Sequence, residues 1–310
     1  TELRSKFPED LAVQKLNRYF EIQDMRLLSV KANFSREGSF VDGAGYTIRL
    51  DQPIYPYRKI YAETLWLQTK DEFNRRNIFR SGIGFDWRLN RDFYVEGGFS
   101  LDHQGREPGI SGGIRWDVDD HLKLAASYNS YSLNLPPKAL LYKFKGQEAK
   151  FAATYRFSED LITAASFSNI RLSDGNNNQN YTFRIDKGLS YSAAWKTRLA
   201  LDGFLTTNRK YDDRGYYAPK YAGSVYLVPM VEHMWYRRYD FSVFDRLYFG
   251  IGPHWEKSFK TEEVWYVRYE QEWRLTDTFY FKVGGQYGKS KYGRDNPHGW
   301  NFYSEIYWNF

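Results

Sequence analysis

Apolar and polar residues alternate along most of this chain with a period of two. Val30, Ala32 and Phe34 alternate with polar neighbours, and the same alternation returns in later segments up to Phe310. This period is typical of β-strands that have one apolar and one polar face, and it predicts about 16 strands, with about 14 or 18 as alternatives. The predicted strands cover residues 25–36, 43–51, 58–69, 76–87, 92–102, 109–118, 121–131, 146–157, 160–171, 180–195, 198–209, 221–235, 239–254, 262–274, 278–290 and 299–310.

The connections between these strands alternate in length. Short turns on one side and long loops on the other are typical of an antiparallel transmembrane β-barrel of a bacterial outer membrane. The short connections are predicted at 89–91, 118–120, 158–160, 196–197, 237–238 and 276–277, and the long ones include 174–180, 211–219 and 292–297.

Residues 1–24 lack this alternation and form a separate segment. Pro8 opens a short helical pattern with Leu11, Leu16 and Phe20 as its apolar positions. Proline followed by acidic residues is typical of the start of a helix. We therefore expect a short N-terminal helix over 1–24 and a barrel over 25–310. The helix is either a small periplasmic plug or cap, or the end of a larger N-terminal domain.

The composition agrees with an all-β membrane protein. Aromatic residues make up 19% of the chain, and a membrane barrel places such rings in two girdles at the lipid headgroups. The mean hydropathy of -0.69 is low because half of each strand faces a polar lumen. A soluble β-propeller would need a repeat of about 40–45 residues, which the chain lacks. The tryptophans expected at the periplasmic rim are Trp87, Trp116, Trp195, Trp235, Trp273 and Trp308, and those expected at the opposite rim are Trp255, Trp265 and Trp300.

Targeting and charge narrow the function further. No apolar stretch of about 18 residues exists, so no transmembrane helix is expected. The chain starts at Thr1 without a signal peptide, which predicts a mature chain or a fragment, and it has no cysteine. The net charge is +6 with scattered basic residues, so we expect no nucleic-acid partner. The five histidines lack metal-ligand spacing, and no catalytic motif is present. We therefore expect no enzyme, metal or cofactor, with a barrel enzyme that uses His103 or His298 as the alternative.

The polar face of the strands carries the candidate site. Charged residues that faced lipid near the midplane would cost about 2–4 kcal/mol each for Arg or Lys, so they are expected to line a water-filled lumen. Acids and bases there either pair into a wall network or form a track for a sugar chain, because aromatic rings stack on sugars and carboxylates bind hydroxyls or amines. Asp245 falls on the lipid-facing side, so we expect a bulge within 239–254 that shifts that strand. The candidate track residues are Asp86, Glu96, Asp102, Asp117, Glu148, Asp186, Asp202, Glu232, Glu270, Glu272, Glu305, Tyr94, Tyr226, Tyr248, Tyr266 and Tyr303.

Residues 133–141 form an apolar loop that contains Pro136 and Pro137. Two prolines exclude a central strand. We expect this loop to fold over or into the pore mouth as a constriction, or to rest on the rim.

The order of these segments resembles a known family. The helix at 8–12, Pro-Glu-Asp-Leu-Ala, is similar to the end of a tetratricopeptide-type array, and it runs directly into a barrel that ends Tyr-Trp-Asn-Phe. This order resembles the outer-membrane exporter of the biofilm polysaccharide poly-N-acetylglucosamine. The resemblance implies a passive exit pore with both termini in the periplasm and an acidic lumen for the partly deacetylated, cationic polymer. It also implies upstream repeats that bind the polymer and its deacetylase.

Other partners and functions stay open at this point. The last strand, with alternating apolar positions and a terminal Phe310, resembles the signal read by the barrel-assembly machinery, and outer-membrane lipid would surround the wall. Exporters of cellulose or alginate share the same design. A general or substrate-specific diffusion porin is a further alternative, although a porin needs no periplasmic arm.

Overall fold

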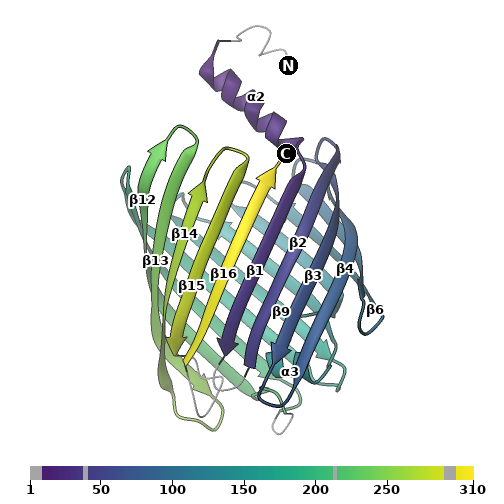
Figure 1. The fold of residues 1–310 in the computed structure, drawn as a ribbon. Coiled ribbons are helices and arrows are strands. Elements are labelled where there is room, and N and C mark those ends of the chain that lie inside the picture. Colours follow the sequence, from purple (N-terminus) through teal and green to yellow (C-terminus); the bar gives the residue numbers. More distant parts are fainter. Residues whose placement is uncertain (1–8, 38–40, 212–214, 290–297) are drawn as a thin grey trace.

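The strands form one closed antiparallel barrel (Figure 1). In this computed structural model the described residues are 9–37, 41–211, 215–289 and 298–310. Each strand pairs with its neighbours in sequence, and β1 closes the barrel by pairing with β16. The strands are β1 (Leu27–Glu37), β2 (Val41–Tyr55), β3 (Arg58–Lys70), β4 (Arg75–Arg88), β5 (Phe93–Asp102), β6 (Glu107–Asp117), β7 (Leu122–Ser132), β8 (Gly146–Arg156), β9 (Leu161–Leu172), β10 (Asn177–Tyr191), β11 (Trp195–Asn208), β12 (Tyr221–Arg238), β13 (Phe241–Glu256), β14 (Glu262–Arg274), β15 (Phe279–Lys289) and β16 (His298–Asn309).

The predicted strand count of 16 is confirmed, whereas two of the predicted short turns are wrong. The long loop expected at 174–180 is shorter, because β10 already begins at Asn177, and the one expected at 292–297 lies outside the described residues. The turn expected at 196–197 lies at 192–194, where the Ser192 hydroxyl accepts a hydrogen bond from the Trp195 amide at 3.0 Å. The turn expected at 237–238 lies at 239–240. A β-bulge between Met234 and Tyr236 lengthens β12 by one residue. Tyr239 in the turn has a positive φ of 53°, and a tyrosine in the sequence does not indicate such a backbone conformation.

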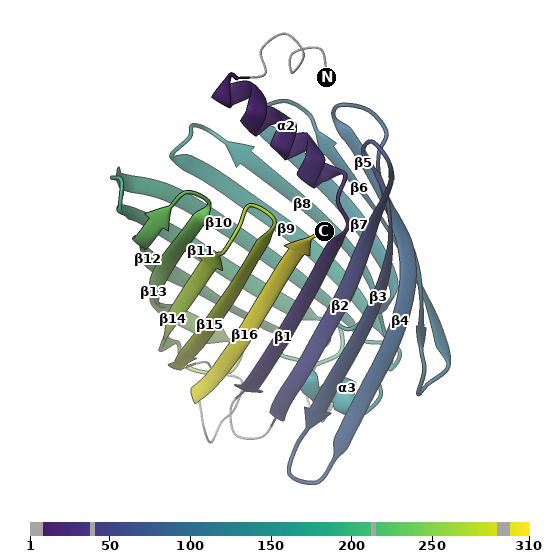
Figure 2. The same cartoon turned by 45° about the horizontal axis from the view of Figure 1, so that its top comes forward.

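The helix α2 (Leu11–Gln23) precedes the barrel, as predicted. Its N-cap is Asp10, whose carboxylate accepts a hydrogen bond from the Ala12 amide at 2.7 Å. The helix lies at the rim where β16 ends, and none of its residues is buried (Figure 2). We call this the terminal rim, and the opposite end the loop rim. Neither described helix is long and apolar enough to cross a membrane.

Cross-strand register divides every strand into an outer and an inner face. Phe34 of β1 pairs with Phe302 of β16, and both side chains are about half exposed. Exposed aromatic and aliphatic side chains continue along such rows and form an apolar outer wall, which is the surface that lipid contacts. Trp116 and Trp308 lie on this wall near the ends of β6 and β16, at the terminal rim.

Asp245 lies on the outer wall, and its own strand is regular there. It pairs with His233 and Gln271, between the outward residues Val243 and Leu247. The bulge that we expected within 239–254 is therefore wrong, because the bulge lies in the neighbouring strand β12 instead.

Candidate functional site

The predicted track residues all occupy strand positions of the inner face. Tyr303 and Glu305, for example, alternate with the exposed outer residues Phe302 and Ile306. The register then carries this parity from strand to strand around the barrel, because directly paired residues share a face. The candidates nevertheless fall into groups with different surroundings.

The first group forms an ion-pair network on β11–β14. Arg246 lies 2.6 Å from a Glu232 oxygen and 2.9 Å from a Glu272 oxygen. Lys196 also pairs with Glu232 at 2.9 Å, and Arg274 pairs with Glu272 at 2.7 Å. Each carboxylate therefore has two basic partners, so this part of the wall carries little uncompensated negative charge.

A second network occupies β10 and β11. Asp186 pairs with Arg198 at 2.7 Å and with Arg184 at 3.2 Å, and Arg184 reaches Asp202 at 3.2 Å. Asp186 and Asp202 therefore pair with basic residues of the wall, which is the first of the two alternatives that the sequence left open for the lumen charges.

Several tyrosine rings share the inner face of β12–β16 with Glu270. Glu270 accepts hydrogen bonds from the Tyr303 hydroxyl and, at 3.3 Å, from the Tyr248 hydroxyl. The Arg268 guanidinium lies 3.9 Å from the Tyr248 ring centre. Tyr226 and Tyr266 meet edge to face, with ring centroids 5.5 Å apart. These rings form a polar aromatic surface along one side of the lumen.

A stacked tyrosine pair lies near the terminal rim. The ring centroids of Tyr280 and Tyr307 are 4.6 Å apart, and Glu305 accepts a hydrogen bond from the Tyr307 hydroxyl at 3.1 Å. A cavity of about 700 Å³ opens beside this pair and is also lined by Lys282 and Glu272. It forms a vestibule at the entrance nearest to α2.

The wall formed by β3–β5 carries carboxylates of a different kind. Asp86 and Glu96 pair directly across β4 and β5, and Glu63 lies on the adjacent strand β3. Within the described parts of the chain, these three carboxylates make no hydrogen bond and no ion pair. Basic residues lie near them without forming an ion pair. Arg49 is opposite Glu63 and Lys59 is opposite Asp86 in the register, and Arg115 and Lys150 line the cavity that contains Glu96.

Tyr61 and Glu63 were missed among the predicted track residues. The Tyr61 ring lies on a floor made by Gly84 and Gly98, where an added Cβ would come within 2.3 Å and 2.6 Å of it. The Arg49 guanidinium covers the ring at 3.8 Å. Alternation over 58–69 places both missed residues inward, but the glycines that admit the ring lie on other strands, so sequence spacing alone does not reveal this contact.

Two further cavities line this side of the lumen. One of about 230 Å³ contains Tyr61 and Glu63, and one of about 290 Å³ contains Asp86, Tyr94 and Glu96. Each combines an aromatic ring and at least one carboxylate that forms no ion pair with basic residues, which are Arg80 in the first cavity and Arg115 and Lys150 in the second.

The loop between β7 and β8 folds inward at the loop rim and packs on inner-face residues of the wall. It contains the short helix α3 (Pro137–Leu141), in which Ala139 and Leu140 are buried. They pack with Ile78 of β4 and Ile170 of β9, which are inward residues of two separate parts of the wall. The Arg76 side chain donates a hydrogen bond to the Leu140 carbonyl at 2.5 Å. We call residues 133–145 the plug loop.

Two predicted track residues hold this region in place. Glu148 accepts hydrogen bonds from the Ser132 hydroxyl at 2.7 Å and from the Asn134 amide at 2.8 Å. Asp102 accepts one from the Tyr131 hydroxyl at 2.8 Å and is 1% exposed. Both carboxylates thus anchor the strand and loop around the mouth.

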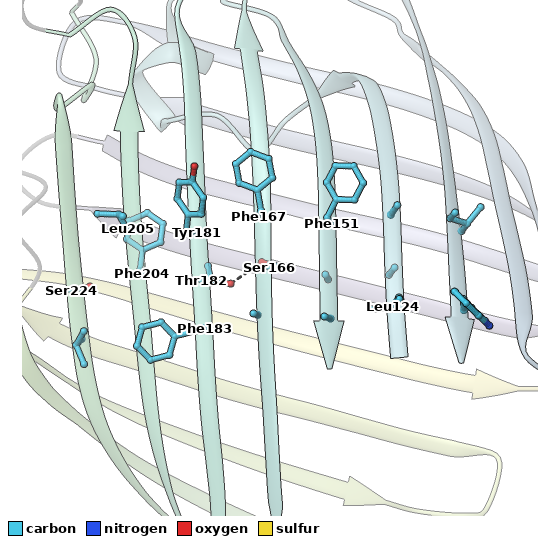
Figure 3. A pocket seen from close by; sticks show the side chains of 18 of the residues that line it. Leu124, Phe151, Ser166, Phe167, Tyr181, Thr182, Phe183, Phe204, Leu205 and Ser224 are labelled. Atoms are coloured by element: carbon cyan, nitrogen blue, oxygen red, sulfur yellow. Dashed lines mark hydrogen bonds between the residues drawn. The ribbon is translucent and has the colours of Figure 1, made fainter. Parts of the chain in front are cut away.

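Another cavity lies on the outer wall and is separate from the residues of the lumen (Figure 3). It measures about 920 Å³ and is lined by the rings of Phe151, Phe167 and Tyr181 and by small residues such as Ala153 and Ala165. All of these face outward in the register, so the cavity is part of the lipid-contact surface.

No group of three or more potential ligand side chains that could hold a metal ion is found within the described ranges.

Comparison with known proteins gives a family and a fold. The family model of the PgaA membrane beta barrel domain matches residues 53–306. Among solved structures, a bacterial polysaccharide outer membrane secretin superposes with a TM-score of 0.84 at 16% identity, over 93% of this chain and 99% of that chain. CdiB from Acinetobacter baumannii (TM-score 0.54, 8% identity, 92% and 60% covered) and OprB from Pseudomonas putida (0.51, 9%, 96% and 97%) share the barrel fold. No curated protein matches the chain. Because the family match covers most of the chain, this protein belongs to the PgaA membrane β-barrel domain family and is a polysaccharide export pore of the outer membrane, a transport barrel rather than an enzyme.

Proposed function

We propose that the exported polymer is partly deacetylated poly-N-acetylglucosamine and that it threads passively through the lumen. The observation that carries this proposal is the set of carboxylates that form no ion pair, Glu63, Asp86 and Glu96, which lie beside Tyr61 and Tyr94. A deacetylated glucosamine unit carries an ammonium group, which a carboxylate binds through a charge-assisted hydrogen bond. The acetylated units present sugar faces that stack on aromatic rings, and at Tyr61 and Tyr94 a sugar would have to displace the guanidinium groups of Arg49 and Arg115.

The neutralised networks support a one-sided track. Asp202, Glu232 and Glu272 each have a basic partner, so a passing ammonium group would compete with an arginine or lysine there. Glu63 and Asp86 form no ion pair, although Arg49 and Lys59 lie opposite them in the register, so an ammonium group would meet weaker competition there. The cationic polymer is therefore expected to run along β3–β6 rather than along β10–β14.

The orientation and partners are part of the same proposal. We place the terminal rim in the periplasm, with α2 connecting the barrel to an upstream repeat domain that binds the deacetylase. The barrel-assembly machinery would read the last strand, β16. The vestibule beside Tyr280 and Tyr307 would then be the entrance for the polymer.

The test is block of pore current by glucosamine oligomers in planar bilayers. The triple variant Glu63→Gln, Asp86→Asn and Glu96→Gln should bind deacetylated oligomers about tenfold more weakly, which corresponds to about 0.5 kcal/mol for each of three solvated charge pairs. Binding of fully acetylated oligomers should not change. Polymer secretion by cells that carry this variant should fall.

A matched control removes the same charge outside the lumen. Glu72→Gln, Glu159→Gln and Glu263→Gln alter exposed side chains of loops, turns and the outer wall, and they should leave the block unchanged. If the lumen variant and this control behave alike, the cationic-polymer proposal is wrong. Stronger block by anionic oligomers would instead favour an alginate-like polymer, and block by neutral glucans a cellulose-like one.

A diffusion porin is less well supported. The plug loop packs Leu140 against the inward residue Ile78 at the mouth, and we propose that it narrows the passage, whereas a diffusion porin depends on a permanently open one.

A further inference from the structure

The outer wall carries a built polar site around Asp245. Its carboxylate accepts hydrogen bonds from the Tyr269 hydroxyl at 3.0 Å, from the Gln271 amide at 2.9 Å and from the indole N–H of Trp235. Trp235 belongs to β12, and the other two donors belong to β14. Three side chains from both neighbouring strands thus converge on one carboxylate that faces lipid.

The β-bulge in β12 is part of this arrangement. The register between β12 and β13 shifts between Met234 and Tyr236, so Trp235 is the extra residue and has no direct partner on β13. A bulge re-aims the side chain that it carries, and here the re-aimed indole donates to Asp245. The neighbouring His233 ring lies between Trp195, with a centroid distance of 4.0 Å, and Trp235, at 5.4 Å. Aromatic rings therefore surround the approach to the carboxylate.

The three donors supply hydrogen bonds to the Asp245 carboxylate but do not neutralise its negative charge. All three are neutral groups, and no basic side chain of the described residues forms an ion pair with Asp245. A carboxylate at the edge of a low-dielectric layer is stabilised most by a cation. Tyr269 and Trp235 are 45% and 65% exposed, so the site is open to a ligand from the membrane.

The position on the wall identifies the class of ligand. Trp273 pairs with Val243, one outward position closer to the terminal rim than Asp245. Tryptophans at this rim mark the level of the lipid headgroups. A primary ammonium group at this depth belongs to a zwitterionic phospholipid headgroup, and aromatic rings beside a carboxylate suit such a cation. We propose that Asp245, with Trp235 and Tyr269, binds the primary ammonium group of a phosphatidylethanolamine headgroup in the leaflet at the terminal rim.

The experiment compares lipids retained by the purified protein in native mass spectrometry. The wild-type protein, exchanged into equimolar phosphatidylethanolamine and phosphatidylcholine, should retain the primary-ammonium lipid preferentially. Asp245→Asn keeps an acceptor oxygen but removes the charge, and it should lower this preference about tenfold, as expected for one charge-assisted contact. The matched control Glu263→Gln removes an exposed outward carboxylate at the loop rim and should behave like the wild type.

Three outcomes would overturn the proposal. Equal retention of both lipids by the wild-type protein would contradict the proposal. This outcome does not depend on whether the Asp245→Asn variant folds. An undiminished preference in Asp245→Asn would show that the lipid binds elsewhere. A dimer that dissociates in Asp245→Asn, with no lipid preference, would assign the site to a second copy of the chain.

Discussion

Arg18 ties the N-terminal helix to the barrel through a single carboxylate. Its guanidinium donates hydrogen bonds to both oxygens of Asp277, which lies in the turn between β14 and β15. This hydrogen bond with Arg18 lowers the pKa of Asp277 below its usual value. The contact therefore depends on the ionised carboxylate.

The contact between Arg18 and Asp277 should be lost in acid. A group whose pKa is lowered by folding contributes stability at neutral pH and loses it as the pH falls through the lowered value, here below about pH 4. Spin labels on α2, at Lys15, and on the β14–β15 turn, at Thr276, should report a short distance at pH 7 and a broad distribution in acid.

The variant Asp277→Asn is the control for this prediction. It should show the broad distribution at every pH, because the ionisable partner is gone. An unchanged short distance in Asp277→Asn would mean that other contacts hold the helix.

Sequence alternation predicted which way a side chain points, but not what it touches. It placed Asp86 and Glu272 on the same inner face, and the structure distinguishes them by their partners. Partners depend on cross-strand register and on side-chain length, neither of which the spacing within one strand contains. The same limit explains why Tyr61 on its glycine floor was missed.

Among the elements, the plug loop is held at the pore mouth by apolar packing. Ala139 is fully buried in that packing, so Ala139→Asp places an unpaired carboxylate in an apolar cluster at a cost of several kcal/mol unless the loop moves out. We expect the loop to leave the mouth and the single-channel conductance in planar bilayers to rise.

Lys143→Asp provides the matched control for the plug loop. It changes an exposed residue of the same loop and should leave the conductance near the wild-type value. Equal conductance of Ala139→Asp and the wild type would mean that ions already pass around the loop.

The strands were predictable because a membrane wall imposes alternation on every one of them. The errors lie where a local exception adds or redirects a residue, as at the Met234–Tyr236 bulge and the turn closed by Ser192. The short helix α3 was not predicted either, since its apolar residues are buried by the barrel interior rather than by a periodic face of its own.

At the scale of the whole molecule, the proposed orientation can be tested because the chain has no cysteine. A cysteine introduced at Gln104, in the turn between β5 and β6 at the loop rim, should react with a membrane-impermeant maleimide on intact cells. One introduced at Lys15 of α2 should react only after the outer membrane is permeabilised. Both cysteines should be labelled equally in the denatured protein. The reverse labelling pattern on intact cells would mean that the barrel has the opposite orientation in the membrane.

The paired charges of the lumen bear on how a long chain can move. Around Arg246 the acids and bases already bind one another, so a sugar that passes finds no deep energy minimum on that side. Transport through a pore needs sites that are favourable enough to enter and weak enough to leave. For the proposed track along β3–β6, this means that the wall of paired charges on β10–β14 would bind the polymer only weakly, so it would let the chain move on while the other wall holds it in line.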